Sequence, residues 1–470
     1  MTQLRTLVVI AHHGESHRHF VRDLARRYRS MPRLQADVVV TAEQPKDCGP
    51  DVAEVRVGLP DKNPWSLPFA HQQVFAERVD RYDLFVYSED DIGVTERTID
   101  AFLAATPHLA PDEIAGFLRY EVDADGKPRL NDLWGHYHCV PGSARRRGPY
   151  LVAETTNEHA GFYVVTQAQL RRALASGGLS RGPRVTRYHL PETAATDIYT
   201  GCGFKKVYCV SHADDFLIHH LPQKYLPMLD VTIDEFRHQV AVLERILDGQ
   251  HPATELCAVE SPHWPMRWPK SYFEPARPEL LDAVPAQCRR VLSVGAGFGK
   301  LERALQARGH EVTALPLDSV HGGALARHGV QMVYGELREL LRTLPRRSFD
   351  AVVSSNLLHL QPDAAAIVRG CAELVAPGGA LALTGVNLNR LTTRWKRRLG
   401  LDEHERLRSF ERGGFCILPP SAFAHEARAA GLVDVATTWF EPDRVGARLP
   451  RKVLGELTAR NWLLAGRRAP

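Results

Sequence analysis

The chain has 470 residues, which is more than one domain usually holds, so we expect two or three domains. Hydrophobic residues make up 44% and charged residues 24%, close to the averages for globular proteins, which excludes a disordered, collagenous or membrane-bundle chain. The net charge of +4 is too small over this length to indicate a nucleic-acid partner, and we predict none.

Targeting and cysteine patterns point to the cytoplasm. The first apolar run, residues 7–11, is far shorter than the ~20 residues of a membrane span, and no signal-peptide pattern accompanies it. The eight cysteines are scattered without a Cys-x-x-Cys spacing, so we interpret them as reduced packing residues. We therefore expect a cytoplasmic protein.

The first half of the chain alternates strand and helix patterns. Apolar, β-branched runs predict strands at 4–11, 36–41 and 84–88, and helical patterns follow at 20–30 and 95–106. Such alternation is typical of an α/β domain, which we place at residues 1–248.

Three consecutive carboxylates, Glu89, Asp90 and Asp91, end the buried strand at 84–88. Packing them together costs several kcal/mol in repulsion and desolvation unless a cation lies among them. Hard oxygen ligands suit Mg²⁺ or Mn²⁺, so the cluster predicts a divalent metal site. An exposed acidic loop at the start of the next helix explains the cluster equally well.

Later motifs give residues 4–225 a resemblance to the GT-A glycosyltransferases. The motifs are a small-residue turn at His159-Ala160-Gly161, a helix that carries Glu192 and Asp197, and the pair His219-His220. The resemblance implies a nucleotide-sugar donor and a metal held by Asp91, Glu89 and His220, with His219 a close second to His220.

Further site residues follow from the same resemblance. It implies that Glu89 and Asp90 also contact the nucleotide ribose, and that His12 and Thr41 border the nucleotide. If the reaction inverts the anomeric centre, Asp197 is the expected base, with Glu192 as the runner-up. Because Glu192 follows Pro191 in a first helical turn, a helix-dipole role suits it at least as well.

Residues 249–278 form a predicted connector. The segment carries six prolines interleaved with Trp264 and Trp268, which interrupts regular elements. A free linker rarely carries such large apolar rings, so we expect this one to be packed against a domain.

The second half, residues 279–470, again alternates strands and helices. Strands are expected at 291–294, 311–317, 349–354 and 380–384, and two antiparallel closing strands at 433–440 and 461–465. Gly295, Gly297 and Gly299 follow the first strand, where a ligand can lie against the backbone. Asp318 ends the second strand, where a carboxylate can accept both ribose hydroxyls.

With Pro377-Gly378-Gly379 before the fifth strand, this half resembles the class I S-adenosylmethionine-dependent methyltransferases, from about Tyr272 to Pro470. The resemblance implies a Rossmann-like fold with the cofactor on the three glycines, its ribose on Asp318 and its adenine near Glu336. Ser293 stands where the family often has an acid, and Pro316 is unusual in a central strand. A nicotinamide-binding domain remains the alternative.

His359 and His404 are candidate bases for methylation of a hydroxyl or amine, although a structural role explains each of them as well. Eight basic and four acidic residues lie between Arg390 and Arg412, where this family builds its acceptor cover. That surplus can meet a phosphate-bearing acceptor or an anionic membrane, or it is a solvated helical face.

These observations lead to the hypothesis of a bifunctional enzyme. It would transfer a sugar to an acceptor hydroxyl with the help of a metal, and it would O-methylate a glycan or glycosylated metabolite with S-adenosylmethionine. Two alternatives stay open: a methyltransferase that carries a non-catalytic carbohydrate-binding module, and an active glycosyltransferase with a degenerate methyltransferase scaffold.

Overall fold

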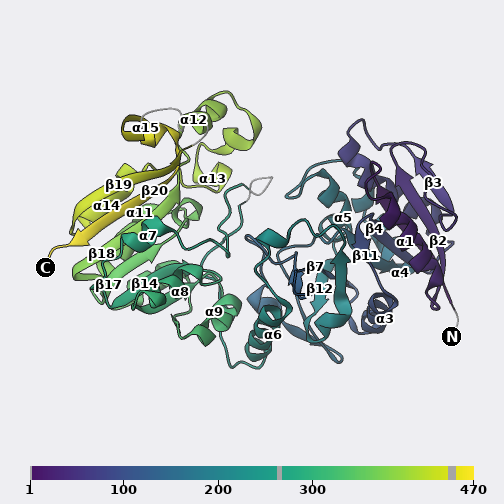
Figure 1. The fold of residues 1–470 in the computed structure, drawn as a ribbon, viewed down its shortest axis with the longest axis horizontal. Helices are drawn as coiled ribbons and strands as arrows, with labels where there is room; N and C mark the ends of the chain where they lie inside the picture. The colour runs from purple at the N-terminus through teal and green to yellow at the C-terminus, as the bar shows by residue number, and fades with distance from the viewer. Residues whose placement is uncertain (1–2, 262–266, 443–450) are drawn as a thin grey trace. The chain divides into compact units, whose positions relative to one another are not determined.

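A computed structural model describes residues 3–261, 267–442 and 451–470 of the chain. It divides into two compact units, Met1–Leu247 and Asp248–Pro470 (Figure 1). Pro262, Trp264 and Pro265 of the predicted connector lie outside the described residues. Within those residues, no helix has both the length and the apolar character needed to cross a bilayer.

The first unit is built around a five-stranded sheet with the order β11-β4-β1-β2-β3. All neighbouring strands are parallel except β11, which pairs antiparallel with β4. The central residues 7–10 of β1 are fully buried, as expected for a parallel strand covered on both faces. The bounds are β1 (Leu4–His12), β2 (Leu34–Ala42), β3 (Glu54–Val57), β4 (Leu84–Glu89) and β11 (Phe162–Thr166).

Two four-stranded sheets complete this unit, with the orders β6-β12-β10-β9 and β5-β13-β7-β8. Strand β13 lies between β5 and β7, so His220 pairs with Ile92 and comes close to the end of β4. The strands are β5 (Ile92–Gly93), β6 (Glu113–Ala115), β7 (Leu118–Val122), β8 (Pro128–Leu130), β9 (Arg145–Arg147), β10 (Tyr150–Ala153), β12 (Lys205–Cys209) and β13 (Leu217–His220).

Helices of the first unit follow the strands in the expected α/β manner. Helices α1 and α2 pack against β1, and Thr95 opens α3 with a capping box. The helices are α1 (Arg18–Ser30), α2 (Ala70–Arg78), α3 (Glu96–Ala105), α4 (Gln167–Ala175), α5 (Leu190–Thr200) and α6 (Ile233–Leu247).

The second unit contains a seven-stranded sheet with the order β16-β15-β14-β17-β18-β20-β19. The first five strands are parallel, and β20 runs antiparallel to both β18 and β19. The strands are β14 (Arg290–Ala296), β15 (Glu311–Pro316), β16 (Gln331–Met332), β17 (Phe349–Ser354), β18 (Val375–Val386), β19 (Leu432–Pro442) and β20 (Ala459–Arg468). Pro316 is the last residue of β15, where a missing N–H does least harm to the ladder.

Helices lie against this sheet, as the left part of Figure 1 shows. Helix α8 contacts β14, and α11 contacts both β17 and β18. The helices are α7 (Pro278–Asp282), α8 (Lys300–Ala307), α9 (Ser319–Leu325), α10 (Leu337–Thr343), α11 (Ala364–Leu374), α12 (Leu391–Arg398), α13 (Phe410–Gly413), α14 (Pro420–Ala429) and α15 (Arg451–Thr458).

The described part of the connector packs along the sheet of the second unit. The Leu256 amide donates to the Leu317 carbonyl, and the Leu256 carbonyl accepts from the Leu337 amide. Glu255 forms an isolated β-bridge with Asp318. The connector therefore runs across the carboxyl edge of the strands, where α/β sheets bind ligands.

Candidate functional site

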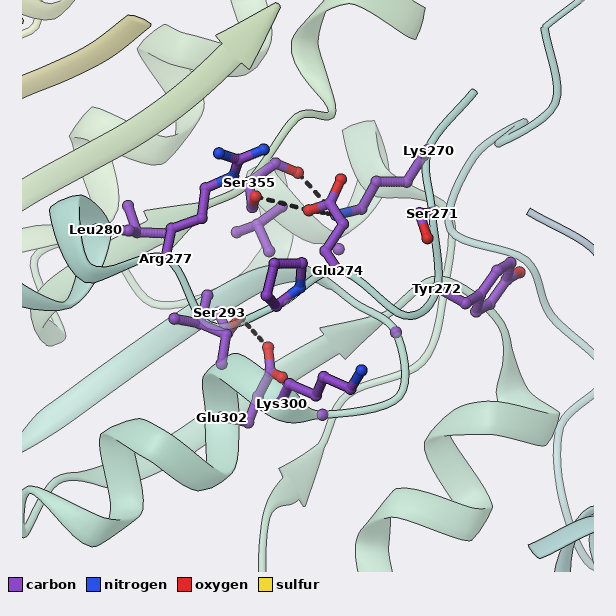
Figure 2. A pocket seen from close by; sticks show the side chains of 16 residues that line it. Lys270, Ser271, Tyr272, Glu274, Arg277, Leu280, Ser293, Lys300, Glu302 and Ser355 are labelled. Atoms are coloured by element: carbon purple, nitrogen blue, oxygen red, sulfur yellow. Dashed lines mark hydrogen bonds and ion pairs between the residues drawn. The ribbon is translucent and has the colours of Figure 1, made fainter. Parts of the chain in front are cut away.

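The three predicted glycines form a tight turn between β14 and α8. Gly295 and Gly299 have φ angles of 88° and 83°, which favour glycine. A Cβ atom on Gly297 would lie 2.2 Å from the carbonyl oxygen of Tyr272. All three line a cavity of about 30 Å³, shown in Figure 2.

Residues of the connector form the opposite wall of this cavity (Figure 2). The Lys270 ammonium lies 2.8 Å from the Glu274 carboxylate and donates to the Ser355 carbonyl at 2.8 Å. The Ser355 hydroxyl donates to Glu274 at 2.7 Å. A largely buried cation and anion thus face the glycine turn, which fits the amino and carboxylate groups of an amino-acid ligand.

Ser293 of β14 stands where the resembled family often has an acid, and Glu302 of α8 brings a carboxylate to the same place. The Ser293 hydroxyl donates to Glu302 at 2.5 Å, and both residues line the cavity. Glu302 is only 3% exposed. The only sequence signal for this residue was its position in the first turn of the helix after the glycines.

Asp318 lies at the end of the second strand as expected, but it also caps α9. One carboxylate oxygen accepts from the His321 amide at 2.8 Å, and the other lies 2.9 Å from the His321 ring. The Tyr272 ring packs 4.2 Å from the His321 ring. Asp318 is therefore covered by the connector, whereas Glu336 is an exposed N-cap of α10.

The structure places neither predicted base of this unit on the glycine cavity. His359 donates from Nε2 to the Trp268 carbonyl at 2.7 Å, and its Nδ1 has no partner among the described residues. Burial lowers the pKa of His359 to about 4. His404 packs edge-on against the Trp268 ring. Both histidines thus contact Trp268 of the connector, His359 through its backbone carbonyl and His404 through its ring.

In the first unit, the acidic cluster opens into a cavity of about 520 Å³ at the carboxyl ends of β1 and β4. That volume is typical of small-molecule sites, which span roughly 300–1,000 Å³. The polar residues that line it are His13, Ser16, His17, Glu89, Asp90, Asp91, Arg119, His159, Glu192, His220 and Lys224.

His17, Asp90 and Asp91 each offer a metal-ligating atom, and these three atoms lie within 4.8 Å of one another. His17 Nδ1 lies 2.9 Å from Asp90, and His220 Nε2 lies 3.5 Å from Asp91. Oδ1 of Asp91 is buried and has no partner among the described residues. A cation fits this set, because it would satisfy that oxygen.

This set differs from the predicted ligands Asp91, Glu89 and His220. Glu89 is not in the group, and its carboxylate packs against Gly161. Burial, together with the neighbouring Asp91, raises the pKa of Glu89 to about 8. His17 was missed because it follows β1 in the chain, far from the acidic triplet.

Two predicted nucleotide contacts are also placed elsewhere. His12 is fully buried, and its Nδ1 lies 2.6 Å from Asp90, so it orients a carboxylate and does not line the cavity. Thr41 is fully buried in β2 and does not line the cavity either. His12 Nε2 and the Thr41 hydroxyl are buried and have no partner among the described residues.

The structure brings Glu192, and not Asp197, to the cavity. Asp197 is fully buried, and Arg184 donates to its two oxygens at 2.5 and 3.1 Å. Five residues along a helix correspond to a rotation of about 140°, so the two acids face different ways. Oε2 of Glu192 is buried without a partner among the described residues.

Two cations and an aromatic ring complete the cavity, and sequence reasoning found none of them. Arg119 on β7 is held by Asp132 at 2.8 Å, and Lys224 follows β13. Trp65 lies at the cavity and is 68% exposed. The only available signal for Trp65 was an aromatic residue in the proline-flanked sequence Asn63-Pro-Trp-Ser-Leu-Pro68.

Comparison with known proteins identifies the second unit. Residues 268–437 match a family model described as a methyltransferase domain, so the C-terminal part of the chain carries a methyltransferase domain. The match begins inside the segment interpreted as the connector.

Among the relatives of this chain are proteins named ubiquinone biosynthesis O-methyltransferase. The protein from Xylella fastidiosa (strain 9a5c) is 36% identical over 136 residues, which cover 27% of this chain and 53% of the relative. The protein from Xanthomonas oryzae pv. oryzae (strain PXO99A) is 33% identical over 147 residues, covering 29% and 62%. The chain thus spans little more than half the length of these relatives.

Among solved structures, an S-adenosylmethionine-dependent methyltransferase from Mesorhizobium loti is 21% identical and covers 41% of this chain and 96% of its own. The TM-score of 0.32 is too low to support a conclusion.

Proposed function

We propose that the second unit transfers a methyl group from S-adenosylmethionine to an acceptor oxygen. The observation that carries this proposal is the glycine turn with Lys270 and Glu274 opposite it, in a domain that matches a methyltransferase family model. The relatives named as O-methyltransferases support oxygen as the methylated atom.

Each group of the site has a separate task in this proposal. When bound, S-adenosylmethionine supplies an electrophilic methyl group, so the main demand on the protein is positioning. Lys270 would hold the α-carboxylate and Glu274 the α-amino group, because their charges are complementary to an amino acid. Asp318 would accept the ribose hydroxyls once the connector exposes it.

The acceptor is proposed to be a hydroxyl that ionises readily. Among the described residues that line the glycine cavity there is neither His359 nor His404, so neither candidate histidine is placed to take the proton of an alcohol. A phenol or enol needs less help, because its own pKa lies closer to the pH of the reaction.

Calorimetric titration of the full chain with S-adenosylhomocysteine tests this function. We expect one site per chain, and we expect Glu274→Gln to weaken binding about tenfold through the loss of one charged hydrogen bond. Glu339→Gln, at an exposed position on α10, is the matched control. If S-adenosylhomocysteine gives neither binding heat nor thermal stabilisation, the proposal is wrong.

A second function is favoured for the first unit, because one cavity holds both a possible metal site of histidine and aspartate side chains and two cationic side chains. We propose metal-dependent transfer of a sugar from a nucleotide-sugar donor to an acceptor hydroxyl. His17, Asp90 and Asp91 would hold Mn²⁺ or Mg²⁺, which would neutralise the charge on a diphosphate leaving group. Arg119 and Lys224 would bind the phosphate oxygens.

The remaining residues supply a base and a platform for this reaction. Glu192 faces the cavity and would accept the proton of the acceptor hydroxyl. Trp65 offers an exposed ring on which a base or sugar can stack. Together with the methyltransferase, this unit would make the chain a bifunctional enzyme acting on a glycan or glycosylated metabolite.

Thermal-shift measurements with a panel of nucleoside diphosphates, each with and without Mn²⁺, test the second function. We expect a metal-dependent stabilisation by one nucleotide that Asp91→Asn abolishes and that Asp125→Asn, in a turn, leaves intact. If no nucleotide stabilises the protein in either condition, the first unit is better described as a carbohydrate-binding module beside an active methyltransferase.

A further inference from the structure

Helix α12 exposes an apolar stripe. Leu391, Trp395 and Leu399 are 49%, 59% and 52% exposed. They are spaced four residues apart, so they lie on one face of the helix. Thr393, on the opposite side, is buried and anchors the helix to the unit. The apolar stripe therefore points away from the core, which is the reverse of an ordinary amphipathic surface helix.

Basic side chains surround this stripe. The eight residues of α12 include Arg394, Lys396, Arg397 and Arg398 and no acidic residue. Arg394 and Arg398 lie next to Leu391 and Trp395 on the helical surface, and neither forms an ion pair with the described parts of the chain. Burial, and to a smaller extent the nearby Arg394, lower the pKa of Arg397.

The helix borders an open groove of about 940 Å³ that is likewise lined by apolar and basic side chains. Leu407, Arg408, Ile417 and Leu457 line the groove with the side chains of α12. Leu401 and Leu418, in the same part of the chain, are 41% and 43% exposed. Exposed large apolar side chains that gather in one region among polar residues are typical of a binding surface.

The chemistry of the surface selects its partner. A second copy of the chain, docked symmetrically, would bring like charges together on this patch. An anionic bilayer satisfies both features, because tryptophan and leucine enter the headgroup region while arginines pair with lipid phosphates. We propose that α12 and the groove beside it bind the surface of an anionic lipid bilayer.

The surface formed by α12 and the groove lies toward the same edge of the sheet as the glycine turn. Helix α12 follows the carboxyl end of β18, which is parallel to β17, itself parallel to β14. Carboxyl ends of parallel strands meet at one edge of a sheet, so α12 and the glycine turn lie toward the same edge. The docking proposal does not depend on methyl transfer, and its test requires no turnover.

Flotation of the full chain with lipid vesicles tests the proposal. We expect binding to vesicles of phosphatidylcholine mixed with phosphatidylglycerol, little binding to phosphatidylcholine alone, and weakening by high salt. Because each basic residue near an anionic surface contributes about fivefold, Arg394→Gln with Arg398→Gln should reduce partitioning roughly 25-fold. Trp395→Ser should reduce it separately, by removing the aromatic anchor.

Controls separate this role from folding and from self-association. Arg338→Gln with Arg342→Gln removes the same charge from exposed positions on α10 and should bind vesicles like the unchanged chain. Retained S-adenosylhomocysteine binding or an unchanged circular dichroism spectrum shows that a variant is folded. The proposal is overturned if anionic vesicles do not bind, if the α12 double variant binds fully, or if Trp395→Ser only turns a dimer into a monomer in sedimentation.

Discussion

Replacing Gly297 with alanine should separate the connector from the glycine turn. The new Cβ would lie 2.2, 2.7 and 2.8 Å from the oxygen, Cα and carbonyl carbon of Tyr272. These are backbone atoms, which cannot rotate away as a flexible side chain can. Overpacking costs about 1–3 kcal/mol, and loss of the hydrogen bond from the Phe298 amide to the Tyr272 carbonyl adds ~1 kcal/mol. We expect the second unit to lose about 2–4 kcal/mol.

Scanning calorimetry of the full chain measures this loss, because two compact units can give separate transitions. The transition of the second unit, identified by its shift with S-adenosylhomocysteine, should move to lower temperature. Gly142→Ala is the control, since nothing lies within 4 Å of its Cβ position and its φ is not positive. An unchanged transition in Gly297→Ala would refute the close approach of connector and turn.

Three further outcomes are expected. His71 is buried, and burial lowers its pKa to about 4, so the unfolded chain binds more protons between about pH 4 and 6.5. His71 should therefore lower the stability of the first unit on acidification through that window by up to ~1.4 kcal/mol per pH unit, and urea titrations of His71→Gln should show a slope smaller by this amount, since the buried His136 and His159 also have lowered pKa values. Asp197→Ala should destabilise the first unit by about 3–5 kcal/mol, because it leaves Arg184 unpaired, while Mn²⁺ affinity by calorimetry stays unchanged. Loss of Mn²⁺ binding in the Asp197→Ala variant would show that Asp197 belongs to the metal site after all. His17→Ala should weaken Mn²⁺ binding at least tenfold while leaving thermal stability in the absence of metal within about 1 kcal/mol, and equal affinity would remove His17 from the ligand set.

Local patterns predicted the glycine turn well. The strand expected at 291–294 is β14, and Gly295 and Gly299 have the positive φ angles that the turn requires. Asp318 follows β15 by two residues and caps α9 for the same reason, since strand length and the following helix are set by neighbouring residues. These features depend on residues close together in the chain.

Features that depend on residues far apart in the chain could not be predicted from the sequence. His17 and Asp90 are 73 positions apart, and only the parallel pairing of β1 with β4 brings them together. The choice between Glu192 and Asp197 depends on which face of α5 meets the cavity, and both faces of that helix are buried. No periodic pattern distinguishes a cavity-facing side from a core-facing side when both carry mixed residues.

The connector packs against the second unit, in keeping with the expectation that its tryptophans do not belong to a free linker. Its backbone hydrogen-bonds to the strand ends of this unit, and its Tyr272 carbonyl fills the space that Gly297 leaves. A cavity of about 30 Å³ is far below the size of ligand sites, so S-adenosylmethionine can enter only if this segment shifts. The free energy of that shift is subtracted from the affinity for the cofactor. Cofactor affinity is therefore set by how tightly the connector packs on the turn as well as by direct contacts.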